Sequence, residues 1–309
     1  MSSRLDLHCH TTASDGRTSP AALVAHAASI GVQVLAITDH DTTAGVPAAL
    51  AAARQHAVTV VPGVEISTIS GREEIHILGY FVDIDNRELQ SLLVRTREVR
   101  AERAQKMLAR LDDLGLPVAW DQVMSKAVDG QSVGRTHVAM ALLEAGHVAS
   151  CEEAFTLWIG RDCPAYIERY KLAPEEAIEL VRRSGGIPVL AHPYIYSRYG
   201  RCKSALDLKH WLPRLQAAGL LGIETFYPHY PHRTSRRLLA LAMKYDLLVT
   251  GGSDFHGTTI GNGLGNVDVP WPVWKALERR RRLVELGAAG AVSEDTGRLA
   301  GVARSQVRP

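Results

Sequence analysis

The sequence predicts an α/β fold in which a β/α barrel is interrupted by a helical insertion. Three observations lead to this prediction. Short apolar runs alternate with helical stretches in the first and last parts of the chain, the middle part shows only helical patterns, and polar residues follow most of the apolar runs. Strands that alternate with helices form a largely parallel sheet whose two faces are covered. A length of 309 residues fits one barrel with an insertion.

The first part of the predicted barrel covers residues 1–87. Strands are expected over 4–7, 34–38, 58–64 and 75–82, with helices over 19–30 and 44–56 between them. Ser19 and Pro20 mark the start of the first helix, because serine caps helix N-termini and proline fits the first turn. The order of these elements favours parallel strands.

Residues 88–163 form the predicted helical insertion domain. A long helix is expected over 88–115, followed by shorter helices over 120–128, 136–145 and 152–159. The long helix carries a basic series, namely Arg95, Arg97, Arg100, Arg103 and Lys106. This series has two interpretations, a solvated helix face or a track for RNA, and we favour the first because charged side chains are mostly exposed.

The barrel pattern resumes over 164–285. A helix is expected over 174–184, and strands over 187–191, 220–225 and 247–250 with helices between them. A short helix starting near Arg279 and a loose C-terminal tail, 286–309, complete the prediction.

Composition and charge favour a soluble globular protein. The hydrophobic share of 46% is ample for a large core, and the net charge of +2 favours no polyanionic partner by itself. No apolar run is long enough to span a membrane, and the N-terminus lacks the apolar core of a signal peptide. The cysteines Cys9, Cys151, Cys163 and Cys202 show no CxxC spacing, which favours free thiols. We therefore expect a cytoplasmic protein without a membrane contact, and the sequence indicates no protein partner.

Histidines and carboxylates gather where apolar strands end. In DLHCH at 6–10, His8 and His10 share one face of a strand, because successive side chains alternate. GSDFH at 252–256 repeats this spacing after another strand. Further clusters at strand ends are TDHD at 38–41, GVE at 63–65 and AHP at 191–193, whereas EIH at 74–76 carries His76 inside its apolar run. Parallel barrel strands bring their C-terminal ends to one mouth, so the sequence predicts that these clusters converge there.

In these motifs the chain resembles the PHP (polymerase and histidinol phosphatase) phosphoesterases. The matching segments are DLHCHTTASDG at 6–16, ITDHDT at 37–42, PGVEIS at 62–67, EIHILGY at 74–80, LAHP at 190–193 and GSDFHG at 252–257. The resemblance implies a distorted (β/α)7 barrel, the PHP fold. GRTH at 134–137 is similar to a subgroup of small bacterial enzymes that act on nucleoside mono- and bisphosphates or on short 5′-phosphorylated RNA.

The resemblance also implies a set of nine metal ligands. His8, His10, Glu65 and Asp254 would hold one metal, Glu65 would bridge to a second with His76 and His192, and Asp15, His40 and His256 would form a third site. This donor set suits two to three divalent transition metals, namely Mn, Fe or Zn, better than Mg or Ca, which prefer all-oxygen shells. Within the set, we expect Asp15, His40, Glu65 and His256 to carry catalysis.

The predicted activity is that of a metal-dependent phosphohydrolase acting through a hydroxide that bridges the metals. The expected substrate is a nucleotide, either a nucleoside 3′,5′-bisphosphate or a 5′-monophosphate. Alternatives are a 5′-3′ exoribonuclease on short 5′-phosphorylated RNA and a histidinol phosphatase or cyclic phosphodiesterase. A non-catalytic metal-binding barrel is disfavoured because all nine ligands are present.

Residues outside the ligand set are expected to contact the substrate. The resemblance places Arg135 and His137 over the mouth from the insertion, where the planar fork of an arginine suits phosphate. Tyr227 and His229 follow a strand and so lie near the same mouth, where they would stack on a base; a packed loop is the alternative. Asp6 and Asp39 flank ligands, and they either orient the imidazoles or bond to nearby backbone.

Overall fold

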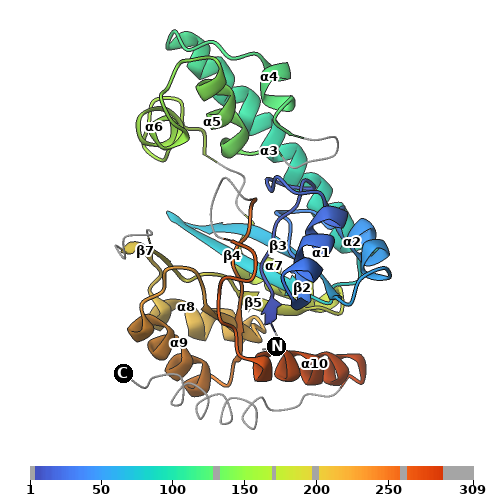
Figure 1. The fold of residues 1–309 in the computed structure, drawn as a ribbon. Coiled ribbons are helices and arrows are strands. Elements are labelled where there is room, and N and C mark those ends of the chain that lie inside the picture. The colour runs from blue at the N-terminus through green and yellow to red at the C-terminus, as the bar shows by residue number, and fades with distance from the viewer. Residues whose placement is uncertain (1–3, 128–132, 169–171, 197–201, 258–262, 288–309) are drawn as a thin grey trace.

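The computed structural model describes residues 4–127, 133–168, 172–196, 202–257 and 263–287 (Figure 1). Its central sheet has seven strands in the order β1-β2-β3-β4-β5-β8-β9. These strands are β1 (Arg4–Asp6), β2 (Val32–Ile37), β3 (Thr59–Ser70), β4 (Glu73–Tyr80), β5 (Ile187–Leu190), β8 (Gly222–Phe226) and β9 (Leu248–Gly251). Leu7 N–H donates to Gly251 O at 3.2 Å, and a parallel bridge joins Cys9 to Phe255. The first and last strands thus meet, and the sheet closes into the expected distorted barrel.

One strand of the barrel runs against the others. β4 is antiparallel to both of its neighbours, β3 and β5, whereas the remaining neighbouring strands are parallel. The expectation of a largely parallel sheet is confirmed, and β4 is its exception. Only residues 71 and 72 separate β3 from β4, and so short a connection can join only antiparallel strands. The start of β4 therefore lies at the same mouth as the ends of its neighbours.

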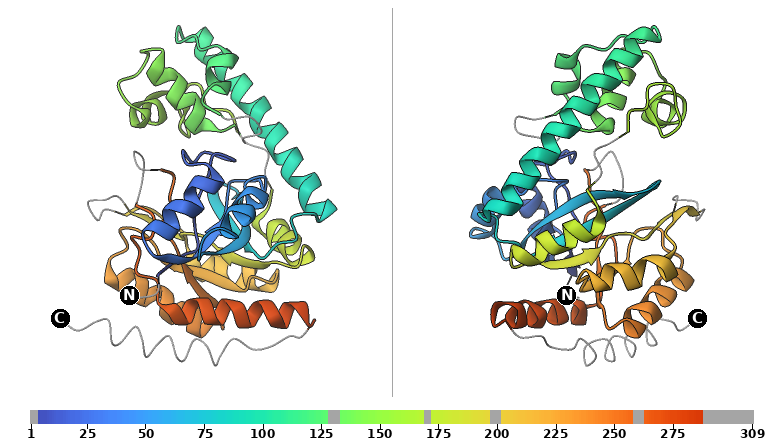
Figure 2. Two further views of the ribbon diagram at one scale, coloured as in Figure 1. Left: turned by 45° about the vertical axis from the view of Figure 1, so that its right-hand side comes forward. Right: turned by 180° about the vertical axis from the view of Figure 1, so that it is seen from behind.

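Helices cover the outside of the barrel (Figure 2). They are α1 (Pro20–Ser29), α2 (Val46–Ala53), α7 (Pro174–Arg183), α8 (Leu208–Ala217), α9 (His232–Lys244) and α10 (Trp271–Glu285). Ser19 caps α1 as predicted, because its side chain accepts from Ala22 N–H. Buried Leu7, Tyr80 and Trp211 belong to the main core between sheet and helices.

Two features of the last part of the chain differ from the sequence-based expectation. A small antiparallel hairpin, β6 (Tyr194–Tyr196) and β7 (Cys202–Ala205), follows β5. Such short runs are hard to distinguish from loop by alternation alone. The final helix begins at Trp271 rather than near Arg279, since buried Val273 and Leu277 continue the apolar face upstream. The predicted tail, from residue 288 on, lies outside the described residues. No helix in the described part of the chain is long and apolar enough to cross a membrane.

The segment between β4 and α7 forms a helical unit at one end of the barrel (Figure 1). Its helices are α3 (Arg87–Asp113), α4 (Trp120–Met124), α5 (Arg135–Glu144), α6 (Cys151–Glu153) and the π-helix η1 (Ala154–Ile159). Leu89 and Leu93 of α3 pack into the barrel core, whereas Met107 and Leu111 belong to a separate core within the helical unit. A single continuous helix thus fixes this unit to the barrel. The exact boundaries, 88–163, stay a prediction.

Candidate metal centre

The fold brings all nine predicted metal ligands to one mouth of the barrel. They come from the segments after β1, β2, β5 and β9, from within β3 and β4, and from the loop before α1: His8, His10, Asp15, His40, Glu65, His76, His192, Asp254 and His256. His76 lies here although it is inside a strand, because β4 runs in the reverse direction. Their convergence follows from the topology of the barrel.

The first group consists of His8, His10, Glu65 and Asp254. His8 Nε2 lies 3.3 Å from Glu65 Oε2 and 3.3 Å from Asp254 Oδ1. His10 Nε2 lies 3.2 Å from Glu65 Oε2 and 3.1 Å from Asp254 Oδ1. All four residues offer one donor atom within 4.8 Å of the others, an arrangement that can surround one cation.

Glu65 connects this group to two others. Its Oε1 lies 2.7 Å from His76 Nδ1 and 3.0 Å from His192 Nε2, whereas its Oε2 lies 3.2 Å from His40 Nδ1. A carboxylate whose two oxygens face different imidazoles is suited to bridge two cations. His40, Glu65 and His76 form a second compact donor group.

A third group forms around Asp15. Its Oδ1 lies 3.3 Å from His256 Nε2 and 3.7 Å from His10 Nδ1. Together with His40, these residues offer donor atoms within 4.8 Å of one another. His40 therefore stands between the second and third groups, and can serve either one.

The electrostatics of the cluster favour bound cations. Burial opposes the charged form of His76, but Glu65 and Glu74 outweigh it and raise the pKa of His76 to about 10. Burial is likewise outweighed at His256, where Asp15 and Asp254 raise the pKa to about 10. Neighbouring imidazoles hold the pKa of two carboxyls well below the ordinary range despite burial, chiefly His40 and His8 for Glu65 and His256 and His40 for Asp15. Burial alone dominates at His40, whose pKa falls to about 3.

Unsatisfied buried nitrogens support the same conclusion. His10 Nδ1 and Nε2 and His40 Nδ1 are buried, and although carboxylate oxygens lie near them, none has the geometry of a hydrogen bond. Such atoms are rare in folded proteins and need an explanation, one of which is an ion. A donor set of imidazoles and carboxylates fits Zn²⁺, Fe²⁺ or Mn²⁺. The residues present therefore fit a cluster of divalent transition metals.

Metal loading at neutral pH is expected to release protons. His76 and His256, each with a pKa of about 10, hold protons at pH 7 in the metal-free protein. A metal binds only the neutral imidazole, so it must displace these protons. Since the pKa of His8 is also raised well above its ordinary value, we expect at least two protons released per chain, and tighter metal binding as pH rises toward 10. Titration calorimetry in buffers of different ionisation enthalpy measures this number, and a release near zero would contradict the arrangement.

A buried carboxylate that the sequence analysis missed contacts a ligand of the first group on the side that faces away from the cluster. Glu224 on β8 is fully buried, and its Oε1 lies 3.1 Å from His8 Nδ1. Its Oε2 accepts from the backbone N–H of His192 at 2.8 Å. Glu224 thereby orients the imidazole of His8, leaving Nε2 toward the cluster. The signal was present in the sequence, since an acidic residue inside a predicted buried strand requires a partner.

Replacing Glu224 by glutamine is expected to weaken metal binding by about tenfold, because the amide holds His8 less firmly in the correct tautomer. The fold should remain, since glutamine keeps the shape and can still accept from His192 N–H. Competition with a coloured chelator measures the change in affinity. An unchanged metal affinity would show that Glu224 stabilises the barrel without affecting metal binding.

Asp6 and Asp39 bond to nearby groups rather than to imidazoles. Asp6 accepts from the N–H groups of Ser253 and Gly265, both at 2.8 Å. Asp39 accepts from Thr11 N–H and from Ser14 Oγ, both at 2.7 Å. The two carboxylates therefore fix the loops that carry the ligands, which was the second of the two interpretations.

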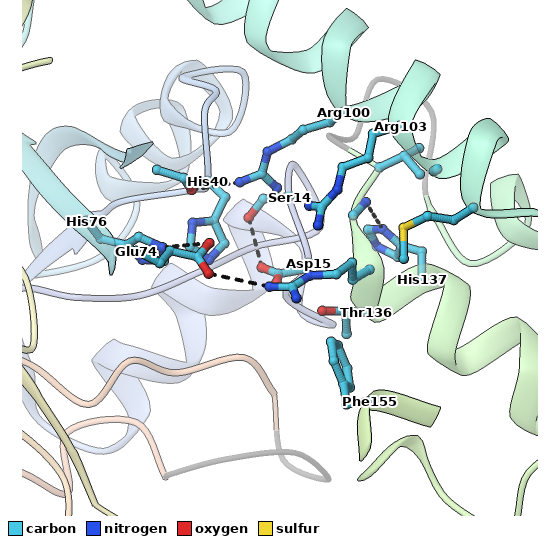
Figure 3. Close-up of a pocket in the computed structure, with 16 residues that line it drawn as sticks. Ser14, Asp15, His40, Glu74, His76, Arg100, Arg103, Thr136, His137 and Phe155 are labelled. Atoms are coloured by element: carbon cyan, nitrogen blue, oxygen red, sulfur yellow. Dashed lines mark hydrogen bonds and ion pairs between the residues drawn. The ribbon is translucent and has the colours of Figure 1, made fainter. Parts of the chain in front are cut away.

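A pocket of about 240 Å³ opens beside the cluster, between the barrel and the helical unit (Figure 3). Its walls include Asp15, His40 and His76 on one side and Arg100, Arg103, Arg135, His137 and Phe155 on the other. This arginine pocket joins predicted ligands to cationic side chains of the helical unit. The expectation that Arg100 and Arg103 lie on a solvated face of α3 is wrong, because both side chains point into this pocket.

The arginines of this pocket are held in different ways. Arg100 Nη2 lies 2.5 Å from Asp41 Oδ2 and donates to Ser67 Oγ at 2.7 Å. Arg103 Nε donates to Ile167 O at 2.7 Å. Arg135 makes a longer contact, 3.4 Å from its Nη2 to Glu74 Oε2, and its guanidinium lies 5.6 Å from the centre of the Phe155 ring. Arg135 is thus the most weakly held of the three.

The other residues predicted to contact the substrate, besides Arg135, lie in different surroundings. His137 lines the arginine pocket, accepts from Gly134 N–H at 3.1 Å and has a pKa lowered by burial. Tyr227 donates its hydroxyl to Asp254 Oδ2 at 2.7 Å, which fixes a predicted ligand. His229 has a φ of 63° and lines another cavity together with Tyr227. Substrate contact by these three residues stays a prediction.

Comparisons with known proteins agree with this geometry. The PHP domain model matches residues 6–146. The chain is 35% identical over 281 residues to a 5′-3′ exoribonuclease of Haemophilus influenzae, covering 89% of this chain and 99% of the relative. The chain belongs to the PHP family.

Two more relatives of this PHP protein extend the comparison. A 3′,5′-nucleoside bisphosphate phosphatase of Chromobacterium violaceum is 31% identical over 281 residues, covering 89% of this chain and 97% of the relative. A solved structure from Bifidobacterium adolescentis, described as a candidate metal-dependent phosphoesterase, matches with a TM-score of 0.81 and 34% identity. That match covers 91% of this chain and 97% of the other. The PHP protein is a metal-dependent phosphoesterase, and thus a phosphoric ester hydrolase.

Proposed function

We propose that this PHP enzyme removes the 3′-phosphate of a nucleoside 3′,5′-bisphosphate. The arginine pocket is the observation that supports this proposal. A nucleotide with two phosphates needs two cationic subsites, one where the ester bond breaks and one for the phosphate that stays. The cluster of predicted ligands provides the first subsite, and Arg100, Arg103 and Arg135 provide the second. A 5′-monophosphate, the other nucleotide substrate that we considered, leaves the arginines without a phosphate to bind.

The residues around the cluster have different proposed roles. When bound, the metals supply a hydroxide nucleophile at neutral pH and neutralise charge on the phosphate. Asp15, His40, Glu65 and His256 are the proposed catalytic residues, and Glu65 stands at the centre of the cluster. Arg135 binds the 5′-phosphate and so fixes the direction of the substrate. His137 lies on the same wall and contacts the substrate beside Arg135.

The metal content of the protein tests the cluster directly. The nine predicted ligands, eight of which form three overlapping donor groups, should hold two to three metals per chain. Mn, Fe and Zn are the expected elements. Elemental analysis of protein purified without chelator gives the number, and fewer than one metal per chain after loading with Mn²⁺ would contradict the proposal.

A panel of phosphoesters tests the substrate. Purified protein loaded with Mn²⁺ is assayed for phosphate release from a nucleoside 3′,5′-bisphosphate, a 5′-monophosphate, histidinol phosphate and a cyclic phosphodiester. The bisphosphate should give the highest kcat/KM, with the 5′-monophosphate as its product. A preference for histidinol phosphate or for the cyclic ester would overturn the proposal.

A further inference from the structure

The two oxygens of the Asp254 carboxylate have different partners. Oδ1 lies 3.3 Å from His8 Nε2, 3.1 Å from His10 Nε2 and 3.6 Å from His256 Nδ1. Oδ2 instead accepts from the hydroxyl of Tyr227 at 2.7 Å, the shortest of these distances. One oxygen thus faces predicted ligands, and the other is held by a phenol.

Tyr227 is itself held in place by aromatic neighbours. It follows β8 directly, and its ring centre lies 5.3 Å from that of His192 and 5.3 Å from that of Tyr230. The ring of His8 is further away, at 6.5 Å. Contacts with neighbouring rings restrict the rotamers open to Tyr227, so its hydroxyl is directed at one place, the Oδ2 of Asp254.

The backbone at Asp254 also needs support. Its φ of 51° lies in the left-handed region, where a residue other than glycine persists only when surrounding contacts hold it. Tyr227 supplies one such contact through the carboxylate, and His256 supplies another, because its Nδ1 lies 2.9 Å from Asp254 O. The orientation of Asp254 therefore depends on the groups around it rather than on its own backbone preference.

The bond from Tyr227 limits what Asp254 can offer a cation. A carboxylate binds a metal through one oxygen or through both, and a hydrogen bond to Oδ2 competes with binding through both. The first group then supplies the donor atoms His8 Nε2, His10 Nε2, Glu65 Oε2 and Asp254 Oδ1. This set matches the tetrahedral shell that Zn²⁺ favours in proteins, whereas Mn²⁺ favours a larger shell that is rich in oxygen.

Two other roles for Tyr227 fit these contacts less well. A proton donor to the leaving group must turn its hydroxyl toward the substrate, whereas this hydroxyl is engaged by Asp254. Stacking on a base would use the ring alone and would give the hydroxyl no function. Removal of the hydroxyl with retention of the ring therefore distinguishes the three roles.

We propose that the Tyr227 hydroxyl holds Asp254 to coordination through a single oxygen and so biases the first metal site toward Zn²⁺ over Mn²⁺. Tyr227 is thus a positioning residue that acts through a ligand and selects the metal. This inference rests on the ligand set of the proposed function, but not on the identity of the phosphoester.

Tyr227→Phe tests this role, because phenylalanine keeps the ring and removes only the hydroxyl. Competition with a chelator measures the affinity of the metal-free full chain for Zn²⁺ and for Mn²⁺. The Zn²⁺ affinity should fall about tenfold, as is typical when a group that orients a ligand is lost. The Mn²⁺ affinity should fall about twofold or less, since the released Oδ2 supplies the further oxygen that this ion accepts. The ratio of the two affinities should thus fall about fivefold or more.

Cobalt gives a spectroscopic measure of the same change. Co²⁺ occupies zinc sites, and its visible absorption weakens as the number of donor atoms around the ion rises. Tyr227→Phe should therefore absorb more weakly than the unmodified protein when both hold equal amounts of Co²⁺. A loss of stability alone would not change this quantity, because the absorption is measured per bound ion.

Tyr230→Phe is the matched control. It removes a hydroxyl from the same loop, one that accepts from Tyr194 N–H at 3.1 Å. Both metal affinities and the cobalt spectrum should stay as in the unmodified protein. The far-ultraviolet circular dichroism spectrum should be unchanged in both variants, since each keeps its ring.

The outcomes separate the three roles. An equal loss of affinity for both ions, with an unchanged cobalt spectrum, would overturn the inference, because the hydroxyl would then hold Asp254 without setting how it binds. Unchanged metal binding with a higher KM for the phosphoester would also overturn it and place the hydroxyl on the substrate. Either result leaves the proposed function in place. Binding of fewer than one metal per chain by the unmodified protein would remove the ligand set of the proposed function, and this inference with it.

Discussion

Glu65→Gln is expected to lower phosphate release by at least about a thousandfold, which corresponds to roughly 4 kcal/mol of transition-state stabilisation. Glu65 is the residue that contacts most of the cluster: its Oε1 faces His76 and His192, and its Oε2 faces His8, His10 and His40. An amide offers one neutral oxygen and one N–H in place of two anionic oxygens. It therefore cannot bridge two cations.

The same substitution should reduce the metal content by at least one ion per chain. The fold should persist, because glutamine matches the shape of glutamate and β3 keeps its pairing with β4. Elemental analysis and the far-ultraviolet circular dichroism spectrum measure these two properties. Glu98→Gln, at an exposed position on α3, serves as the matched control and should behave as the unmodified protein. Normal turnover by Glu65→Gln would exclude the bridging role.

The order of strands and helices could be predicted from local pattern, but strand direction could not. Apolar runs followed by polar clusters indicated β1, β2, β5, β8 and β9 near their observed positions. The apolar run over 75–82 also indicated β4. The direction of β4, however, depends on the two-residue connection after Ser70. We expected a strand ending near residue 64, whereas β3 continues through the mouth to Ser70. Only that extension brings the two strands close enough for a hairpin.

The convergence of the nine predicted ligands could be predicted because the motifs named the residues and the barrel topology brings strand ends to one mouth. Alternation fixes the shared face of His8 and His10, and the resemblance to PHP enzymes implied their partners. Glu224 was missed because it belongs to none of the matching segments and touches the cluster only through the far nitrogen of His8. The inward turn of Arg100 and Arg103 was missed for another reason. Whether one side of a basic helix meets solvent depends on the domain packed against it.

The helical unit explains why its arginines reach the barrel at all. α3 is anchored in the barrel core through Leu89 and Leu93, and its continuation carries Arg100 past Asp41 and Ser67. Asp41 itself has a φ of 52°, which an ordinary residue adopts only when surrounding contacts hold it there. The bond to Arg100 is one of those contacts, so the helical unit and the loop after β2 support each other.

Arg135→Ala is expected to lower kcat/KM for a nucleoside 3′,5′-bisphosphate by about ten- to a hundredfold, because a charge-assisted hydrogen bond contributes roughly 1.5–3 kcal/mol. Its long contact with Glu74, 3.4 Å, leaves the guanidinium available to a phosphate. The loss should be smaller for p-nitrophenyl phosphate, which has no second phosphate for the arginine to hold. Metal content should not change, because guanidinium is not a ligand.

Arg135→Lys separates charge from geometry at this position. Lysine keeps the positive charge but lacks the planar fork that binds two phosphate oxygens at once, so it should recover part of the lost activity on the bisphosphate. Steady-state kinetics on both substrates measure the difference. An equal loss on the bisphosphate and on p-nitrophenyl phosphate would place Arg135 at the scissile phosphate. No loss on either would leave Arg135 as a partner of Glu74 and Phe155 alone, and the proposed bisphosphate substrate would lose its main support.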